Sequence, residues 1–259
     1  MKIPIYQIDA FASKLFSGNP AAVVPLDDWI DDKTMLAIAA ENNLAETAFF
    51  VSGADSFDLR WFTPKFEVDL CGHATLASAW VIFNELRYGS DEIRFECKSG
   101  TLYVQRDGDL LSMDFPSWMP EVVPAPDGLI EALGVEPVEV LKSRDYLVAY
   151  GSEAEIKSIN PDFGKLMKVD TLGVCVTSKG DDADFVSRFF APRAGIPEDP
   201  VTGSTHSELT PYWAGKLAKT KLRALQLSER GGELFCEHQG DRVKIAGYAV
   251  KYLSGEIEV

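Results

Sequence analysis

The hexapeptide Arg60-Trp61-Phe62-Thr63-Pro64-Lys65 occurs a second time, in altered form, as Arg188-Phe189-Phe190-Ala191-Pro192-Arg193. Both copies read arginine, aromatic residue, phenylalanine, small residue, proline and basic residue, and they lie 128 residues apart in a chain of 259. A repeat at half the chain length predicts two lobes of similar fold, related by a pseudo-twofold axis. Residues at the mouths of both lobes would then face a shared cleft, and we expect the function there.

Each copy is followed by a glycine turn that carries a histidine, Cys71-Gly72-His73-Ala74-Thr75 and Thr202-Gly203-Ser204-Thr205-His206. Both turns stand where an extended segment gives way to a helix. Glycine allows unusual backbone angles and close approach of a ligand, and the first amides of a helix attract anions. Two such helix starts facing each other would hold a carboxylate. The alternative is a pair of ordinary helix-start glycines with Ser204 or Thr205 as the cap, but the duplication favours a binding site.

The overall charge limits the choice of partner. The net charge is −15, which would repel nucleic-acid phosphates and anionic lipid headgroups. The sequence therefore predicts neither nucleic-acid nor membrane binding. It contains no P-loop, no GxGxxG and no zinc pattern, so it also predicts no cofactor and no metal.

The chain is expected to be cytoplasmic. Residues 1–9 lack the long apolar core of a signal peptide, and no apolar run elsewhere is long enough to span a bilayer. The four cysteines, Cys71, Cys97, Cys175 and Cys236, are widely scattered and form no CxxC pair, so we expect free thiols in a reducing compartment. Base rates for soluble proteins favour a homodimer.

The pattern of apolar residues predicts a similar order of elements in both halves. In the first half, strands are expected at residues 2–9, 21–25, 46–51, 57–62, 92–97, 101–106 and 110–115, and helices at 31–40 and 73–86. In the second half, strands are expected at 138–141, 146–150, 171–177 and 185–190, helical segments near Ala154 and Phe163, and a helix at 205–217. Pro211 is compatible with that last helix only in its first turns or at a kink. The helix after Gly72 is almost wholly apolar and should be buried on most sides.

The segment Pro116–Pro126 holds four prolines and few core-forming residues, which favours a linker. It divides the chain into an N-terminal lobe at residues 1–116, with Glu46 and the helix after Gly72, and a C-terminal lobe at residues 117–259, with the helix after Gly203. The last strands of the second half have no counterpart in the first. This leaves room for one of them to return and pair with the first lobe.

Glu46 is the only carboxylate in the apolar run from Leu44 to Phe50. If this side chain is buried, its pKa rises towards neutrality, as a general acid or base requires. If it points to solvent, it is an ordinary surface residue of a strand. The residue pattern alone leaves both readings open.

Several motifs, taken in order, resemble those of the PhzF (phenazine-biosynthesis-like) family, which is related in fold to diaminopimelate epimerase and proline racemase. The matching segments cover most of the chain: Phe11, Gly18-Asn19-Pro20-Ala21-Ala22-Val23-Val24, Leu44-Ala45-Glu46-Thr47, Phe62-Thr63-Pro64, Leu70-Cys71-Gly72-His73-Ala74-Thr75-Leu76-Ala77 and Glu198-Asp199-Pro200-Val201-Thr202-Gly203-Ser204. Each motif is weak alone, but the ordered set is specific.

The resemblance implies an α/β (α+β) fold of two pseudo-symmetric lobes, each a curved mixed sheet around a central helix. It implies that Glu46 shuttles a proton on a small, cyclic, amine-bearing carboxylic acid in the cleft between the lobes. His73 and Asp199 match the supporting catalytic residues. The positions that match the substrate-binding residues are Asn19, Gly72, Gly203 and Ser204.

One departure from the related racemases bears on the mechanism. Cofactor-independent racemases place a cysteine before each glycine turn, whereas here Cys71 precedes Gly72 but Thr202 precedes Gly203. A threonine hydroxyl is too weak an acid to replace a thiol, so two-thiol racemisation is disfavoured. We therefore expect an isomerase that uses one carboxylate. An epimerase that pairs Cys71 with Asp199 or Glu46 and a non-catalytic metabolite-binding or protein-interaction module remain as alternatives.

Overall fold

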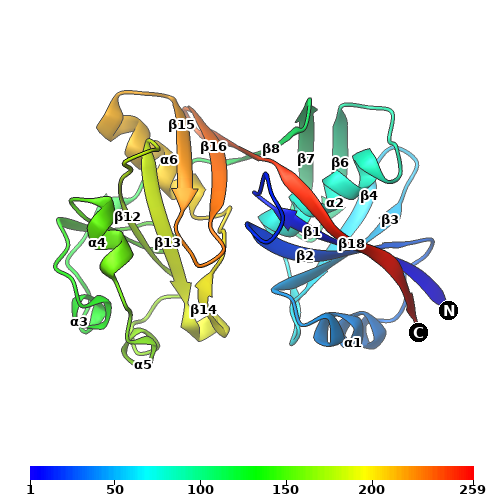
Figure 1. Ribbon diagram of the computed structural model, residues 1–259, viewed down its shortest axis with the longest axis horizontal. Coiled ribbons are helices and arrows are strands. Elements are labelled where there is room, and N and C mark those ends of the chain that lie inside the picture. The colour runs from blue at the N-terminus through cyan, green and yellow to red at the C-terminus, as the bar shows by residue number, and fades with distance from the viewer. The chain divides into compact units, whose positions relative to one another are not determined.

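The computed structural model describes all residues from 1 to 259 (Figure 1). The chain divides into two compact units, which we describe separately. Unit 1 comprises residues 1–114 together with 246–259, and unit 2 comprises residues 115–245. Both units contain helices packed on sheets with parallel and antiparallel strand pairs, so the protein has the mixed α/β class expected from the sequence.

Unit 1 is built around helix α2, the apolar helix that follows Gly72. Its elements are β1 (Lys2–Ala10), β2 (Asn19–Leu26), α1 (Asp32–Asn42), β3 (Glu46–Ser52), β4 (Phe57–Phe62), β5 (Glu67–Val68), α2 (Gly72–Asn84), β6 (Glu92–Cys97), β7 (Gly100–Asp107), β8 (Leu110–Pro116) and β18 (Ala249–Glu258). Helix α2 contains no charged residue and packs against β1, β2 and β3. It is buried along nearly all of its length because its side chains are apolar on every face.

A strand from the C-terminal end of the chain adds to the sheet of unit 1. Strand β18 pairs antiparallel with β1 over the whole of β1, and β1 pairs on its other side with β2. In Figure 1 the red C-terminal strand accordingly lies beside the dark blue N-terminal one. Strand β2 then pairs in parallel with β3, and β3 antiparallel with β4.

Unit 2 repeats part of this order. Its elements are β9 (Glu121–Val122), α3 (Leu129–Leu133), β10 (Glu139–Lys142), β11 (Tyr146–Ala149), α4 (Glu153–Ser158), α5 (Phe163–Leu166), β12 (Val174–Lys179), β13 (Phe185–Ala191), a 3-10 turn (Pro192–Ala194), β14 (Ile196–Asp199), α6 (His206–Leu217), β15 (Lys221–Gln226), β16 (Gly232–Gln239) and β17 (Arg242–Gly247). As in unit 1, a parallel pair (β11 with β12) is followed by an antiparallel one (β12 with β13). The two copies of the hexapeptide occupy the ends of β4 and β13.

Three local features differ from the sequence expectation. The strand expected from residue 171 begins only at Val174, because residues 171–173 form a turn in which the Thr171 hydroxyl donates to the Gly173 carbonyl at 2.9 Å. The proline-rich stretch is not wholly irregular, since β9 pairs within it to β10. Helix α6 begins at His206, one residue later than expected, after a tight turn at residues 203–205.

Pro211 lies in the second turn of α6 and does not end the helix. A proline has no N–H to offer the carbonyl four residues earlier, which is that of Ser207. That carbonyl instead accepts the backbone N–H of Trp118 at 2.9 Å. The contact satisfies the freed acceptor and explains why the helix continues past the proline.

Candidate functional site

Glu46 is placed by the turn that joins α1 to β3. Helix α1 ends at Asn42 and is capped by Asn43, whose backbone is left-handed (φ 50°), and three residues later Glu46 begins the strand. The Asn42 side-chain amide donates to the Thr47 hydroxyl at 3.1 Å and so ties the helix end to the strand start. In the sheet Glu46 lies opposite Ala21 of β2. The residue is only 9% exposed, so the buried reading of this carboxylate is confirmed.

Helix α2 brings His73 to Glu46. His73 is the second residue of the helix, and its Nε2 lies 3.2 Å from Oε2 of Glu46. The other ring nitrogen, Nδ1, lies 3.5 Å from Sγ of Cys71. Thiol, imidazole and carboxylate therefore form a row with the ring in the middle, and we refer to Cys71, His73 and Glu46 as the unit 1 row.

The surroundings of the unit 1 row exclude most water. None of the three residues is more than 9% exposed, and burial lowers the pKa of His73 to about 3 because the charged imidazolium loses its hydration. The ring is therefore neutral at neutral pH and carries one N–H. A neutral imidazole between a thiol and a carboxylate can accept on one side and donate on the other.

The unit 1 row also has the donor types of a metal site, because a carboxylate, a thiol and an imidazole lie with their ligand atoms within 4.8 Å of one another. The imidazole, however, stands between the other two groups and turns a different nitrogen to each. The ring thus separates the other two ligand types, and we assign the row no metal.

Asn19 is the first residue of β2, the strand that pairs with β3, and it is fully buried. The turn before it depends on Gly18, which has a left-handed backbone (φ +68°). A β-carbon at Gly18 would collide with the carbonyl oxygen of Ala10, so only glycine fits there. The sequence-predicted residues Asn19, Glu46, Gly72 and His73 all belong to unit 1.

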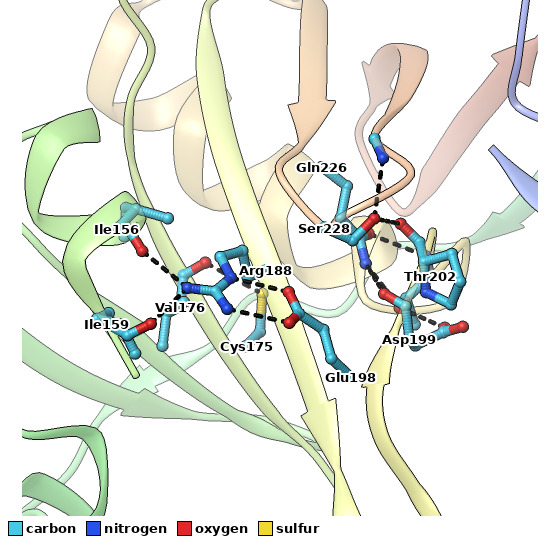
Figure 2. A network of polar contacts seen from close by, with 12 residues as sticks. Ile156, Ile159, Cys175, Val176, Arg188, Glu198, Asp199, Thr202, Gln226 and Ser228 are labelled. Carbon is cyan, nitrogen blue, oxygen red and sulfur yellow. Dashed lines mark hydrogen bonds and ion pairs between the residues drawn. The ribbon is translucent and has the colours of Figure 1, made fainter. Parts of the chain in front are cut away.

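The remaining predicted residues, Asp199, Gly203 and Ser204, belong to unit 2, where Figure 2 shows the polar contacts around Asp199. The Thr202 hydroxyl donates to Asp199 Oδ2 at 2.5 Å. Gln226, at the end of β15, donates from Nε2 to the Asp199 carbonyl at 2.8 Å and accepts the Thr202 N–H on Oε1 at 2.9 Å. This fully buried glutamine fixes the turn that leads into α6.

Sequence reasoning did not identify Gln226. It lies 24 residues beyond Thr202 at the end of an ordinary strand, and no motif surrounds it. Its role follows only from the pairing that places the end of β15 beside the turn. Thr202 thus has a structural task, since its hydroxyl and its N–H hold Asp199 and Gln226 in place.

The two helix starts differ in detail. Neither Gly72 nor Gly203 has a positive φ, so neither glycine is required for its backbone angle. In α2 the first intrahelical bond runs from the Thr75 N–H to the Cys71 carbonyl at 3.1 Å, which leaves the amides of residues 72–74 outside the helix ladder. In unit 2 the corresponding bond runs from the His206 N–H to the Gly203 carbonyl at 3.0 Å, and no side chain caps the helix.

His206 is a structural histidine. Its Nδ1 lies 2.8 Å from the carbonyl of Thr202, which can only accept, so Nδ1 carries the proton. The ring is fully buried beside Phe185, and burial lowers its pKa to about 4. Of the two histidines in the glycine turns, only His73 lies beside an acid that could exchange protons with it.

Comparison with known proteins agrees with these features. The profile of the phenazine biosynthesis-like proteins (PhzC-PhzF) matches residues 8–255. An uncharacterized isomerase of Pseudomonas aeruginosa is 52% identical over 259 residues, with 100% of both chains covered. The crystal structure of a PhzF-family phenazine biosynthesis protein from Enterococcus faecalis superposes with a TM-score of 0.98 at 45% identity, with 100% of each chain covered.

A more distant likeness is confined to the fold. The crystal structure of a hydroxyproline epimerase from Agrobacterium vitis, with bound trans-4-hydroxy-L-proline, superposes with a TM-score of 0.64 at 9% identity and covers 99% of this chain and 92% of that one. The expected relation to the epimerase and racemase fold is thereby confirmed. None of the helices combines the length and apolar character that crossing a bilayer requires.

The fold and the matches define the class: the chain belongs to the PhzC-PhzF family of phenazine biosynthesis-like proteins. Relatives about half identical to it over their whole length are named isomerases. The expectation of an enzyme of the isomerase class is confirmed at that level.

Proposed function

We propose that the protein moves a proton within a small cyclic or amine-bearing carboxylic acid, with Glu46 as the group that takes the proton and returns it. The observation that carries this proposal is the position of Glu46, a nearly enclosed carboxylate at the start of β3 with the His73 imidazole 3.2 Å from it. A proton on carbon is weakly acidic, so its base must be shielded from competing water. Burial beside a neutral ring meets that requirement.

The proposal assigns the substrate carboxylate to the helix starts. In this reading the amides of Gly72 and His73 and those of Gly203 and Ser204 hold the carboxylate, since amides at a helix start carry partial positive charge. Asp199 takes the substrate's amine or hydroxyl, and Asn19 contacts its polar edge. The reading requires two pseudo-symmetric lobes, each with a central helix, that meet at a common cleft. The repeated hexapeptide and the matching strand order of the two units support it.

The experiment is solvent deuterium incorporation into a trial substrate, such as a cyclohexadiene amino acid, by wild-type protein and by Glu46→Gln. The variant keeps the shape of the side chain and removes its basicity, so incorporation should fall by ~10²–10⁴-fold, the usual contribution of a positioned acid or base. Glu41→Gln is the matched control, because it removes an exposed carboxylate from α1 in the same unit. Equal incorporation by wild type and Glu46→Gln would exclude Glu46 as the base.

An epimerase that uses Cys71 is the second candidate, and the contact between Cys71 and His73 favours it. It predicts that Cys71→Ser abolishes turnover while the protein stays folded, whereas the first proposal predicts substantial activity in this variant. The structural task of Thr202 weighs against two-thiol chemistry, because a threonine stands where the second thiol would be.

We also propose a homodimer, which sedimentation velocity would test.

A further inference from the structure

The outer edge of strand β18 has no part in the proposed chemistry. Strand β18 pairs with β1 through one edge, and its residues 252–256 are all exposed. The strand contains no proline, and its single lysine, Lys251, donates to Glu85 at 2.7 Å. Prolines and free lysines commonly protect an edge from pairing with another chain. The outer edge of β18 is therefore a surface to which another strand can add.

The pairing with β1 determines which backbone groups of β18 face outward. The Val259 N–H donates to the Met1 carbonyl at 2.9 Å, and the Met1 nitrogen donates to the Val259 carbonyl. In an antiparallel pair, residues that exchange both bonds alternate with residues that exchange none. Glu256 belongs to the second kind, because the register places it opposite Pro4, which has no N–H to give. The even-numbered residues of the stretch 254–258 therefore turn their N–H and carbonyl groups away from β1.

A groove lies between α1 and the end of β18. It has a volume of about 540 Å³, and its apolar lining comes from Ala37 and Ile38 of α1 and from Ile257. Leu253 and Gly255 lie on the same face of the strand as Ile257, because side chains alternate along a strand. Leu253 is 42% exposed. An added strand would present its own side chains to this groove beside Ile257.

We propose that the added strand is β18 of a second copy of this chain, paired antiparallel about a twofold axis at Gly255. In this register Leu253 of each copy lies opposite Ile257 of the other and enters the groove there. Glu256 lies opposite Ser254, so no two carboxylates face each other. Registers centred on residue 256 or 257 would place two glutamates directly opposite each other, which destabilises a strand pair. A register centred on Ser254 would leave Leu253 opposite Gly255 and outside the groove.

The pairing would continue the sheet of unit 1 from one copy into the next. A twofold axis makes the surface self-complementary, so one edge and one groove serve both copies. The inference rests on the homodimer of the proposed function and names its surface. It is independent of the role proposed for Glu46.

Oxidative cross-linking of the full chain carrying Gly255→Cys tests the register. At the axis residue 255 would face its own copy in a pair without backbone bonds, where the Cα atoms are ~4.5 Å apart and a disulfide can form. A β-carbon at Gly255 meets no atom within 4 Å, so the variant should fold. We expect most of it to run as a covalent dimer on a non-reducing gel. Gly89→Cys is the matched control, because Gly89 is exposed and has equal space, and it should stay monomeric on the gel, as should the wild type with its partly exposed Cys97.

Sedimentation velocity gives a second measurement, which decides the matter if Gly255→Cys does not fold. Leu253→Asp removes an exposed side chain from the monomer but places a charge in the groove of the dimer. The dissociation constant of the dimer should therefore rise at least about tenfold. Leu86→Asp is the control, because Leu86 is an exposed leucine of unit 1 outside β18, and it should dimerise as the wild type does. The melting temperature reports whether each variant is folded.

The outcomes separate the surface from the homodimer. A wild-type protein that sediments as a monomer would overturn both. A dimer that persists in Leu253→Asp, or that folded Gly255→Cys does not cross-link, would overturn the surface alone. Equal cross-linking of Gly89→Cys would mean random collision and would also contradict the register. None of these results depends on deuterium incorporation, so the proposed role of Glu46 is tested separately.

Discussion

Glu208 and Asp145 are buried acids in unit 2 that have no part in the proposed chemistry. Glu208 lies in the first turn of α6, is fully buried, and accepts the N–H of Asp145 on Oε1 at 3.3 Å. Burial, reinforced by the charge of Asp145, raises the pKa of Glu208 to about 8. Burial also raises the pKa of Asp145. Near neutral pH the folded protein therefore holds a proton here that an unfolded chain would release.

This proton makes stability depend on pH. A carboxyl group whose pKa is raised by folding favours the folded state below its ordinary pKa of 4.5, and that stability is lost as the pH rises to about 8. Glu208→Gln keeps an acceptor for the Asp145 N–H but does not titrate. We expect its free energy of unfolding to fall less than that of wild type between about pH 5 and about pH 8. Urea unfolding of both proteins across this pH range measures the difference in their free energies of unfolding.

The control for this prediction is Glu121→Gln, which removes an exposed carboxylate from β9 in the same unit. Its pH dependence should follow that of the wild type. Parallel pH profiles for Glu208→Gln and wild type would show that Glu208 is already ionised in the folded protein.

At the scale of elements, the repeated hexapeptide reproduces one contact in both units. Arg60 of β4 forms two hydrogen bonds with Glu67 of β5, at 2.7 and 3.0 Å, and Arg188 of β13 does the same with Glu198 of β14, at 2.8 and 3.0 Å. Each guanidinium also lies over the phenylalanine two residues on, Phe62 or Phe190, about 5 Å from the ring centre. The arginine lowers the pKa of Glu67 to about 2. The duplicated sequence thus encodes a duplicated strand pair.

Replacing these arginines by lysine should destabilise the two units unequally. Lysine keeps the charge but loses the planar fork, which we expect to cost about 1–2 kcal/mol at Arg60. Arg188→Lys should cost more, because Arg188 also donates to the carbonyls of Ile156 and Ile159, at 3.1 and 2.7 Å (Figure 2), and these would lose their donor. Chemical denaturation of both variants tests the order. A larger loss in Arg60→Lys would contradict it.

At the scale of the whole molecule, unit 1 depends on both ends of the chain. The Val259 N–H donates to the Met1 carbonyl at 2.9 Å, and β18 is a partner of β1 along its length. Deleting residues 249–259 should therefore lower the melting temperature strongly, because β1 loses a neighbour and the buried Ile3 and Ile5 become exposed.

A circular permutant separates this effect from chain order. Joining residue 259 to residue 1 by a short glycine linker, and opening the exposed turn at Gly108 and Asp109, keeps β18 beside β1. We expect the permutant to retain the far-UV circular dichroism spectrum and a melting temperature close to that of the original chain. A truncated chain as stable as the permutant would show that β18 contributes nothing to unit 1.

The sequence by itself determined the features that depend on local pattern and on repetition. The spacing of apolar residues predicted the helix after Gly72 and the strand that contains Glu46. The buried positions of a helix or strand recur at a characteristic spacing along the sequence, and apolar residues follow that spacing. The repeated hexapeptide predicted that β4 and β13 would have similar structures. Similar sequences at equivalent positions of a repeated fold make similar contacts. The ordered motifs pointed to the family and to Glu46, His73 and Asp199 as candidates.

Only the tertiary structure decided what surrounds those candidates. A single charged residue in an apolar strand fits either face, and the burial of Glu46 follows from packing that no local pattern reports. The contact of His73 with Cys71 and Glu46, and that of Gln226 with Thr202, join residues whose side-chain directions depend on helix and strand placement. The return of β18 to β1 is a pairing across the full chain length. Register and side-chain direction are set when distant segments pack together, so the sequence pattern could propose the chemistry but not its geometry.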